Sequence, residues 1–218
     1  MVMKASIIIT SYNYGSFIER CIRSCLEQKY LEATYEVIIV DDASTDDTIE
    51  RVKPYLKKYN NLFLIQNKKN NGVAFTSNEG IKNASGRFVV RVDADDYISP
   101  DFLYLLTRCM KDHQDHFGVS CDYIKVDRFD KHIERFSAKK HPISCGILYP
   151  KDRLSEAGLY NQDFRHCEEL ELKARLGDNY KIINLPIALY FYNIHGNNKT
   201  NDKNGINEAK DKIKKAIY

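Results

Sequence analysis

The stretch VVRVDADDYISPDF, residues 89–102, joins a run of strand-forming residues to three aspartates within four positions. These are Asp93, Asp95 and Asp96. Carboxylates crowded together repel one another and raise each other's pKa, so a positive partner is needed to hold them. The stretch therefore predicts a buried strand that ends at a cation site.

On both sides of this stretch, short apolar runs alternate with amphipathic segments. The apolar runs predict strands at residues 5–10, 35–40, 62–65 and 88–92. Helices are expected over 17–26, from a cap at Ser44 or Thr45 to Tyr59, over 73–84, and from Pro100 onward. This order is typical of a doubly wound, mostly parallel α/β sheet.

The pattern changes near residue 118. Shorter strands with short connections, some of them antiparallel, are expected over 118–126, 128–136 and 144–150. Helices at 151–157 and 168–176 and a strand at 187–192 follow. The tail, 203–218, has five lysines, two acids and one apolar helical face. It predicts a terminal helix that either docks on its own domain or makes a weak contact with a membrane surface or a partner.

Composition narrows the class of protein. The 218 residues form one domain of ordinary size, and a net charge of +3 gives no reason to expect nucleic acid as a partner. Six cysteines without a CxxC pair favour a reducing, cytoplasmic compartment. No run of about 18 apolar residues predicts a transmembrane helix.

Polar residues follow three of the predicted strands directly. The first strand leads into Thr10 and Tyr12, the second into Asp41 and Asp42, and the fourth into the aspartates that begin at Asp93. The carboxyl ends of parallel strands share one edge of a sheet, where such folds bind ligands. GxGxxG and GxxxxGK[ST] motifs are absent, which disfavours dinucleotide and P-loop sites.

Five ordered motifs make the chain resemble the family 2 glycosyltransferases of the GT-A fold, of bacterial type. They are SIIITSYNYGSFIERCIRSCLEQKY, YEVIIVDDASTDDT, NNGVAFTSNEGIKNASGRFVVRVDADD, HCEELELKARL and YFYNIHGNN. The resemblance implies one domain over 1–218. Its parts would be a nucleotide-sugar-binding half (1–117), an acceptor-binding half (118–200) and a basic amphipathic helix (201–218). It also implies transfer of a hexosyl or N-acetylhexosaminyl group, with inversion, to an acceptor hydroxyl.

Residue by residue, the resemblance implies a donor site at the strand ends. Thr10 and Tyr12 would line the base and ribose, and Asn71 would add a donor contact. Asp42 matches the acid that accepts a hydrogen bond from N3–H of uracil or thymine, which suits a UDP-sugar. Asp93 would reach the ribose or a metal-bound water.

The same resemblance implies a metal site and a general base. Asp95 would ligate Mn²⁺ or Mg²⁺, and His195 would approach the metal or the diphosphate. The family's Glu-Asp pair corresponds to Glu168 and Glu169, so Glu169 would be the base, with its oxygen moved by roughly an ångström.

One departure concerns a cation. The family's Ala-Arg-Asn triplet, whose arginine assists the donor, reads Thr76-Ser77-Asn78 here. Arg87 or Lys69 are candidates to replace that arginine.

Two alternatives to a transferase stay open at this point. They are a family member that binds nucleotide or glycan without turnover, and a nucleotidyltransferase on a related fold. As a transferase, the protein is expected to use a glycan or lipid-linked acceptor in polysaccharide synthesis. It would work in the cytoplasm, either free or peripherally bound at the inner face of the membrane.

Overall fold

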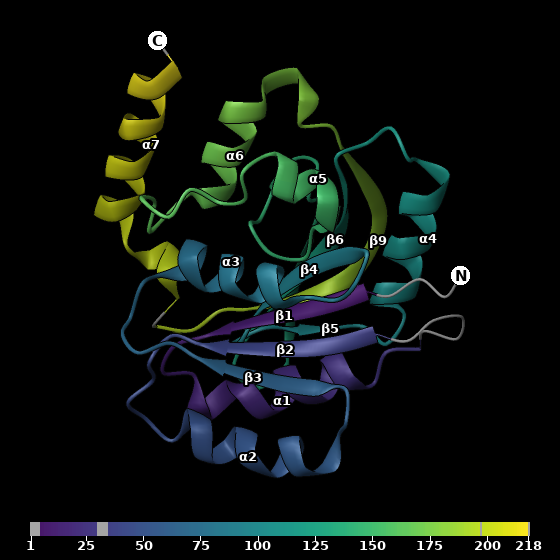
Figure 1. Cartoon of the computed structure of the whole chain (residues 1–218), viewed down its shortest axis with the longest axis vertical. Coiled ribbons are helices and arrows are strands. Elements are labelled where there is room, and N and C mark those ends of the chain that lie inside the picture. The colour runs from purple at the N-terminus through teal and green to yellow at the C-terminus, as the bar shows by residue number, and fades with distance from the viewer. Residues whose placement is uncertain (1–4, 30–34, 197, 218) are drawn as a thin grey trace.

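The computed structural model describes residues 5–29, 35–196 and 198–217, and its centre is a single mixed sheet (Figure 1). Four parallel strands form one side of it in the order β3-β2-β1-β4. Their bounds are β1 (Ala5–Ser11), β2 (Tyr35–Asp41), β3 (Leu62–Gln66) and β4 (Phe88–Asp93). The predicted fold class, a mostly parallel α/β sheet with a smaller antiparallel part, is confirmed.

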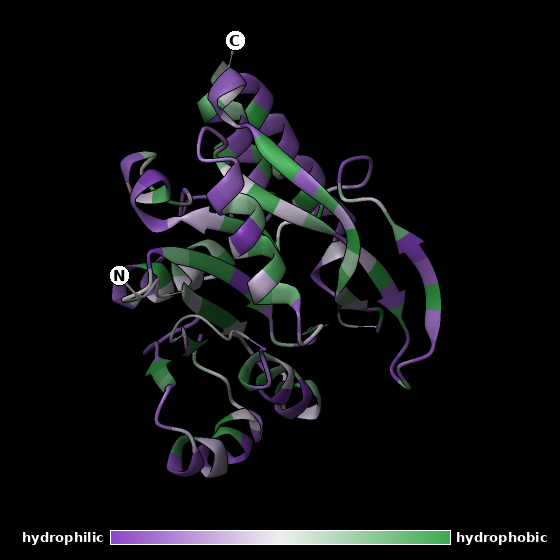
Figure 2. Ribbon diagram, turned by 90° about the vertical axis from the view of Figure 1, so that its right-hand side faces the viewer, coloured by the Kyte–Doolittle hydropathy of each residue, from purple (hydrophilic) through white to green (hydrophobic). Residues whose placement is uncertain are grey.

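Helices cover both faces of the parallel strands, because alternate side chains point to opposite faces. Ile7 and Ile9 of β1 belong to the core under α1 (Gly15–Leu26), while Ile8 belongs to the core under α3 (Val73–Asn83). The second helix on the α1 face, α2 (Thr48–Lys58), lies beside α1 (Figure 1). Figure 2 shows mainly hydrophobic strands and helices of mixed hydropathy, as this packing requires.

The second half of the chain extends the sheet from β4 in the order β8-β6-β9-β5, with β7 paired to β6. Its strands are β5 (Tyr97–Ile98), β6 (Gly118–Val126), β7 (His132–Phe136), β8 (Leu148–Pro150) and β9 (Ile182–Asn193). Its helices are α4 (Phe102–Asp112), α5 (Lys151–Glu156), α6 (Glu168–Leu176) and α7 (Lys203–Ile217), with short 3-10 turns at Gly177–Asn179 and Lys199–Asn201. The β8–β4 pairing is antiparallel, which joins the two halves into one sheet.

Two expectations need correction. The cap expected at Ser44 or Thr45 is wrong, because α2 begins only at Thr48, after Asp47. Ser44 instead donates its hydroxyl to Asp41 at 2.5 Å. The last strand is also longer than expected, since it begins at Ile182.

The terminal helix lies beside α6 (Figure 1). Ile213 is buried, and the Lys212 ammonium lies 4.6 Å from the centroid of the Phe164 ring. These contacts support the docked arrangement for the described part of the tail; residue 218 lies outside the described residues. Within the described ranges, no helix combines the length and apolarity needed to cross a membrane.

Candidate active site

The predicted polar rim is formed at the carboxyl ends of the parallel strands. Thr10 of β1 is paired in register with Asp93 of β4, and its hydroxyl donates to Asp93 Oδ1 at 3.1 Å. Asp41 at the end of β2 is paired with Ser11 on the other side of β1. Tyr12 follows with 42% of its surface exposed. The first-strand residues and the first aspartate of the DxD therefore share one edge.

Asp95 and His195 meet although they are a hundred residues apart in sequence. His195 Nε2 lies 2.8 Å from Asp95 Oδ2, and Asn198 donates its side-chain amide to the same oxygen at 3.3 Å. The Phe17 ring of α1 stacks on the His195 ring at 4.6 Å between centroids, and Tyr14 meets it edge-on at 6.0 Å. The sequence indicated Asp95 and His195 but gave no sign of the aromatic walls, because Tyr14 immediately before α1 and Phe17 in its first turn look like ordinary half-buried packing residues.

Asp96 has a structural environment that differs from those of Asp93 and Asp95. It accepts hydrogen bonds from the Tyr190 hydroxyl at 2.7 Å and from Asn193 N at 2.8 Å, both on β9. Burial, with the nearby Asp95 and Asp93 charges adding to it, raises the pKa of Asp96 well above its usual range. Asp96 therefore anchors the end of β4 to β9.

Asp93, Asp96 and Cys145 offer ligand atoms within 4.8 Å of one another. Asp96 is already hydrogen-bonded on both oxygens, and burial raises the pKa of the Cys145 thiol well above its usual range. A protonated thiol is a poor ligand for hard ions such as Mg²⁺ and Mn²⁺. Asp95 and His195 form the better candidate pair, because both groups lie at the rim.

Asp42 holds the loop that precedes α3. Its carboxylate accepts hydrogen bonds from the Asn67 side chain at 2.7 Å, from Asn71 N at 3.0 Å and from Gly72 N at 2.7 Å. It is only 3% exposed. Asn71 reaches Asp42 through its backbone, while its side chain donates to the Lys69 carbonyl oxygen. Asp42 and Asn71 thus come together as parts of one loop clamp.

The two glutamates at the start of α6 face different partners. Glu168, 4% exposed, accepts a hydrogen bond from Arg91 Nη1 at 2.7 Å. Arg91 Nε also lies 3.1 Å from Asp93 Oδ1, so Arg91 bridges α6 and the end of β4. Burial alone would raise the pKa of Glu168, but the Arg91 charge outweighs it and holds that pKa below its usual range.

Glu169, 7% exposed, lies among tyrosines. The Tyr149 hydroxyl donates to its Oε1 at 2.5 Å, and the Tyr180 hydroxyl donates to the same oxygen. Oε2 is buried and has no hydrogen-bond partner among the described residues. Burial raises the pKa of Glu169, although the two phenols oppose this. Adjacent glutamates thus have pKa values shifted in opposite directions.

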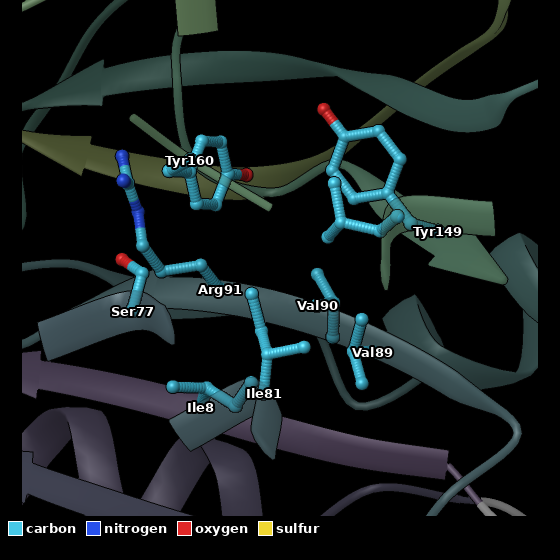
Figure 3. Close-up of a pocket in the computed structure, with 9 residues that line it drawn as sticks. Ile8, Ser77, Ile81, Val89, Val90, Arg91, Tyr149 and Tyr160 are labelled. Carbon is cyan, nitrogen blue, oxygen red and sulfur yellow. The ribbon is translucent and has the colours of Figure 1, made fainter. Parts of the chain in front are cut away.

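The cation expected to replace the family's arginine is not Arg87. Arg87 precedes β4, at the end opposite Asp93, and its exposed side chain rests on the Phe88 ring. Six residues of strand separate it from the rim by roughly 20 Å. Lys69 is exposed in the loop before α3. Arg91 instead lies beside Ser77, in the wall of a small cavity (Figure 3). An arginine inside the apolar run VVRV was the sequence signal for it.

Comparisons with known proteins identify the family and the fold. The sequence profile described as Glycosyl transferase family 2 matches residues 6–168. The poly(ribitol-phosphate) beta-glucosyltransferase of Bacillus spizizenii is 37% identical over 113 residues, which cover 51% of this chain and 18% of that protein. This chain therefore spans about a fifth of that relative's length.

Two solved structures have a similar fold. The S. aureus TarS fragment 1–349 in complex with UDP matches with a TM-score of 0.75 and 25% identity, over 88% of this chain and 61% of that chain. A mannosyltransferase from Pyrobaculum calidifontis, in complex with GDP-Man and Mn²⁺, has a TM-score of 0.73 at 20% identity, over 90% and 59% of the two chains. The second likeness concerns the fold alone.

Proposed function

Since this chain belongs to glycosyl transferase family 2 and has the GT-A fold, we propose that it transfers a sugar from a UDP-sugar to a hydroxyl of a glycan or lipid-linked acceptor. The observation that carries the proposal is the rim. Thr10 and Asp93 are hydrogen-bonded there, and Asp95 meets His195 at 2.8 Å. A nucleoside diphosphate bound at the edge of a parallel sheet would meet these groups first.

The base and ribose of the donor would lie at the ends of β1 and β2. Tyr12 is exposed there and can cover an aromatic base. Asp42 accepts from three protein donors, and a carboxylate has about four acceptor positions, so one remains for N3–H of uracil. Asn71 would act through its backbone, by fixing Asp42 in place.

The residues present fit a divalent ion, Mn²⁺ or Mg²⁺. Asp95 would hold it through its carboxylate, with His195 and Asp93 beside it, because carboxylate oxygens suit these ions. When bound, the ion supplies positive charge that offsets the developing charge of the departing diphosphate. Asp96 stays with β9, where its oxygens are already engaged.

Glu169 is the proposed general base, and the contrast with Glu168 supports it. A general base needs a carboxylate with a high affinity for a proton. Burial raises the pKa of Glu169, whereas the Arg91 charge keeps the pKa of Glu168 low. Tyr149 and Tyr180 both engage Oε1, which orients the group with Oε2 unpartnered among the described residues. A base on the acceptor side gives inversion at the sugar.

The proposed division of labour follows the chain. Residues 1–117 would bind the nucleotide, because β1 and β4 carry Thr10 and Asp93 and Asp42 directly follows β2. Residues 118–200 would form the acceptor side, which includes α6 and its glutamates. The same segment places His195 next to Asp95 at the donor rim. The tail from 201 would serve mainly to cover α6.

A second candidate function is nucleotide or glycan binding without turnover. The enclosure of Glu169 by Tyr149 and Tyr180 favours it, because an acceptor hydroxyl must reach a group that is 7% exposed. Measuring release of UDP from UDP-sugars, with and without candidate acceptors, separates the two.

Calorimetry with UDP, with and without MnCl₂, tests the donor site. The wild-type protein should bind UDP in a manganese-dependent way, and Asp95→Ala should lose that dependence. Asp112→Ala, an exposed acid on α4, is the matched control and should bind like the wild type. Failure of the folded wild-type protein to bind UDP, GDP, CDP or dTDP would overturn the proposal.

A further inference from the structure

Arg91 forms a buried ion triad that spans the two halves of the site. Its guanidinium lies 2.7 Å from Glu168 Oε1 and 3.1 Å from Asp93 Oδ1, and the residue is only 6% exposed. Buried arginines are rare unless they are paired. This one pairs with the DxD on one side and with the glutamates of α6 on the other.

Stability of the fold gives a weak reason to keep such a triad. Taking three charges out of water is costly, and an apolar replacement of similar volume is often as stable. The neighbours are suited to apolar side chains, since Ile8, Ile81, Val90 and Leu154 line the same cavity. What an apolar residue lacks is a rigid fork of donors that can orient two carboxylates at once.

The triad fixes the direction of Asp93. The Thr10 hydroxyl donates a hydrogen bond to Oδ1 from β1, and Arg91 Nε forms an ion pair with the same oxygen from two residues earlier in β4, so Oδ1 is held from two sides. The Asp93 side chain is still 30% exposed at the rim. Its other oxygen, Oδ2, is the one left to meet a ligand there.

The same guanidinium fixes the first residue of α6. Glu168 begins that helix, and Glu169 follows with its carboxylate among the tyrosines. Tethering Glu168 to β4 sets the start of α6 relative to the DxD. The geometry of Asp93 and that of Glu169 therefore depend on one side chain.

We propose that Arg91 is a positioning residue that aims Asp93 at the donor diphosphate and its metal ion while it holds the base-bearing helix. This inference rests on the proposed function of the site. Arg91 would also provide the positive charge that the family's Ala-Arg-Asn triplet provides and that Ser77, at the matching position, lacks. Ser77 Oγ is buried without a hydrogen-bond partner among the described residues, in the same cavity wall as Arg91 (Figure 3). Because the two positions share this wall, exchanging the residues tests whether an arginine at position 77 can pair with Asp93 and Glu168.

The test compares UDP binding by calorimetry, with and without MnCl₂, in Arg91→Met, Arg91→Lys and the exchange variant Arg91→Ser/Ser77→Arg. Arg91→Met should weaken manganese-dependent UDP binding by about 10- to 100-fold, the usual cost of losing a group that orients a ligand residue. Arg91→Lys should lose less, because it keeps the charge without the fork. The exchange variant should recover binding relative to Arg91→Met.

Ile81→Ala is the matched control, because Ile81 lines the same cavity and carries no charge. It should lower the thermal midpoint without changing the manganese dependence of UDP binding. If Arg91→Met does not fold, Arg91→Lys and the exchange variant carry the comparison.

Wild-type binding in the folded Arg91 variants would overturn the inference. So would equal losses in all three of them, because that would make Arg91 a packing residue only. A wild-type protein that binds no nucleoside diphosphate would instead overturn the proposed function.

Discussion

Glu168→Gln and Glu169→Gln are nearly isosteric changes at adjacent positions, and the structure predicts opposite consequences for them. Glu168 neutralises Arg91 at 2.7 Å inside the protein. Glu169 has no cation within salt-bridge distance among the described residues, and its hydrogen bonds come from neutral phenols. Removing the first charge leaves the buried Arg91 guanidinium with Asp93 as its remaining acidic partner, whereas removing the second relieves a desolvated carboxylate.

The magnitudes follow from these partners. Breaking a buried ion pair costs about 3–5 kcal/mol. Glu168→Gln belongs at the lower end, about 3 kcal/mol, because the amide oxygen can still accept from Arg91. Glu169→Gln keeps an acceptor for Tyr149 and Tyr180 and should change the free energy of unfolding by less than about 1 kcal/mol.

Urea unfolding of both variants at pH 8 measures the difference, and repeating it at lower pH tests its cause. The native pKa of Glu168 lies below the ordinary value of 4.5, so its contribution is present above pH 4.5 and is lost as pH falls through that native pKa. The cost of Glu168→Gln should therefore shrink in acid. Glu169 has a raised pKa, so its ionisation destabilises the fold as pH rises above 4.5, and Glu169→Gln should remove that loss.

The functional half of this prediction uses the same proteins. Glu169→Gln should bind UDP like the wild type and transfer sugar about 10²- to 10⁴-fold more slowly, the usual contribution of a general base. Equal destabilisation by the two substitutions would refute the distinction drawn between the glutamates. Undiminished transfer by Glu169→Gln would show that another group takes the proton.

Two further predictions concern the loop and the packing beneath the site. Asp42→Asn should cost about 1–3 kcal/mol, because asparagine has one acceptor oxygen in place of two, so Asn67, Asn71 and Gly72 can no longer all donate to it, and hydrogen exchange of the Asn71 and Gly72 amides should accelerate. Gly80→Ala would place a Cβ 2.4 Å from Ile8 Cγ2 and should lower the urea-unfolding free energy by about 1–3 kcal/mol through overpacking, with UDP affinity preserved in the folded fraction.

Much of the fold could be predicted because its signals are local. The runs at β1, β2 and β4 are mostly apolar and almost wholly buried, as strands covered on both faces must be, and the helices between them have a clear 3.6-residue period. Strand order then places the ends of these strands on one edge. The local sequence pattern gave the wrong cap for α2, because several neighbouring residues can accept the first hydrogen bonds of that helix. Asp46, not Ser44 or Thr45, accepts the hydrogen bond from Thr48 N at the start of α2.

The sequence predicted those candidate-site residues that lie at the ends of strands or directly after them. Thr10, Asp42 and Asp93 end strands, and Asp95 follows two residues later. Arg91 and the tyrosines around Glu169 were missed, because an arginine within a strand and tyrosines on β8 and the loop before β9 look like ordinary packing residues. Glu168 lies 77 residues from Arg91, and Glu169 lies 20 residues from Tyr149 and 11 from Tyr180, so only the assembled fold brings these groups together.

Charge balance explains why these missed residues matter. The rim gathers Asp93, Asp95 and Glu168, and an anionic diphosphate would add to their repulsion. Arg91 offsets part of this charge inside the protein, on the side away from solvent, where its guanidinium cannot be replaced by water or screened by salt. A cation supplied from solution can then complete the balance beside Asp95 and the Asp93 side chain, which is 30% exposed. The site thus needs one fixed positive charge and one exchangeable charge, and the sequence pattern VVRVDAD carries the first together with ligands for the second.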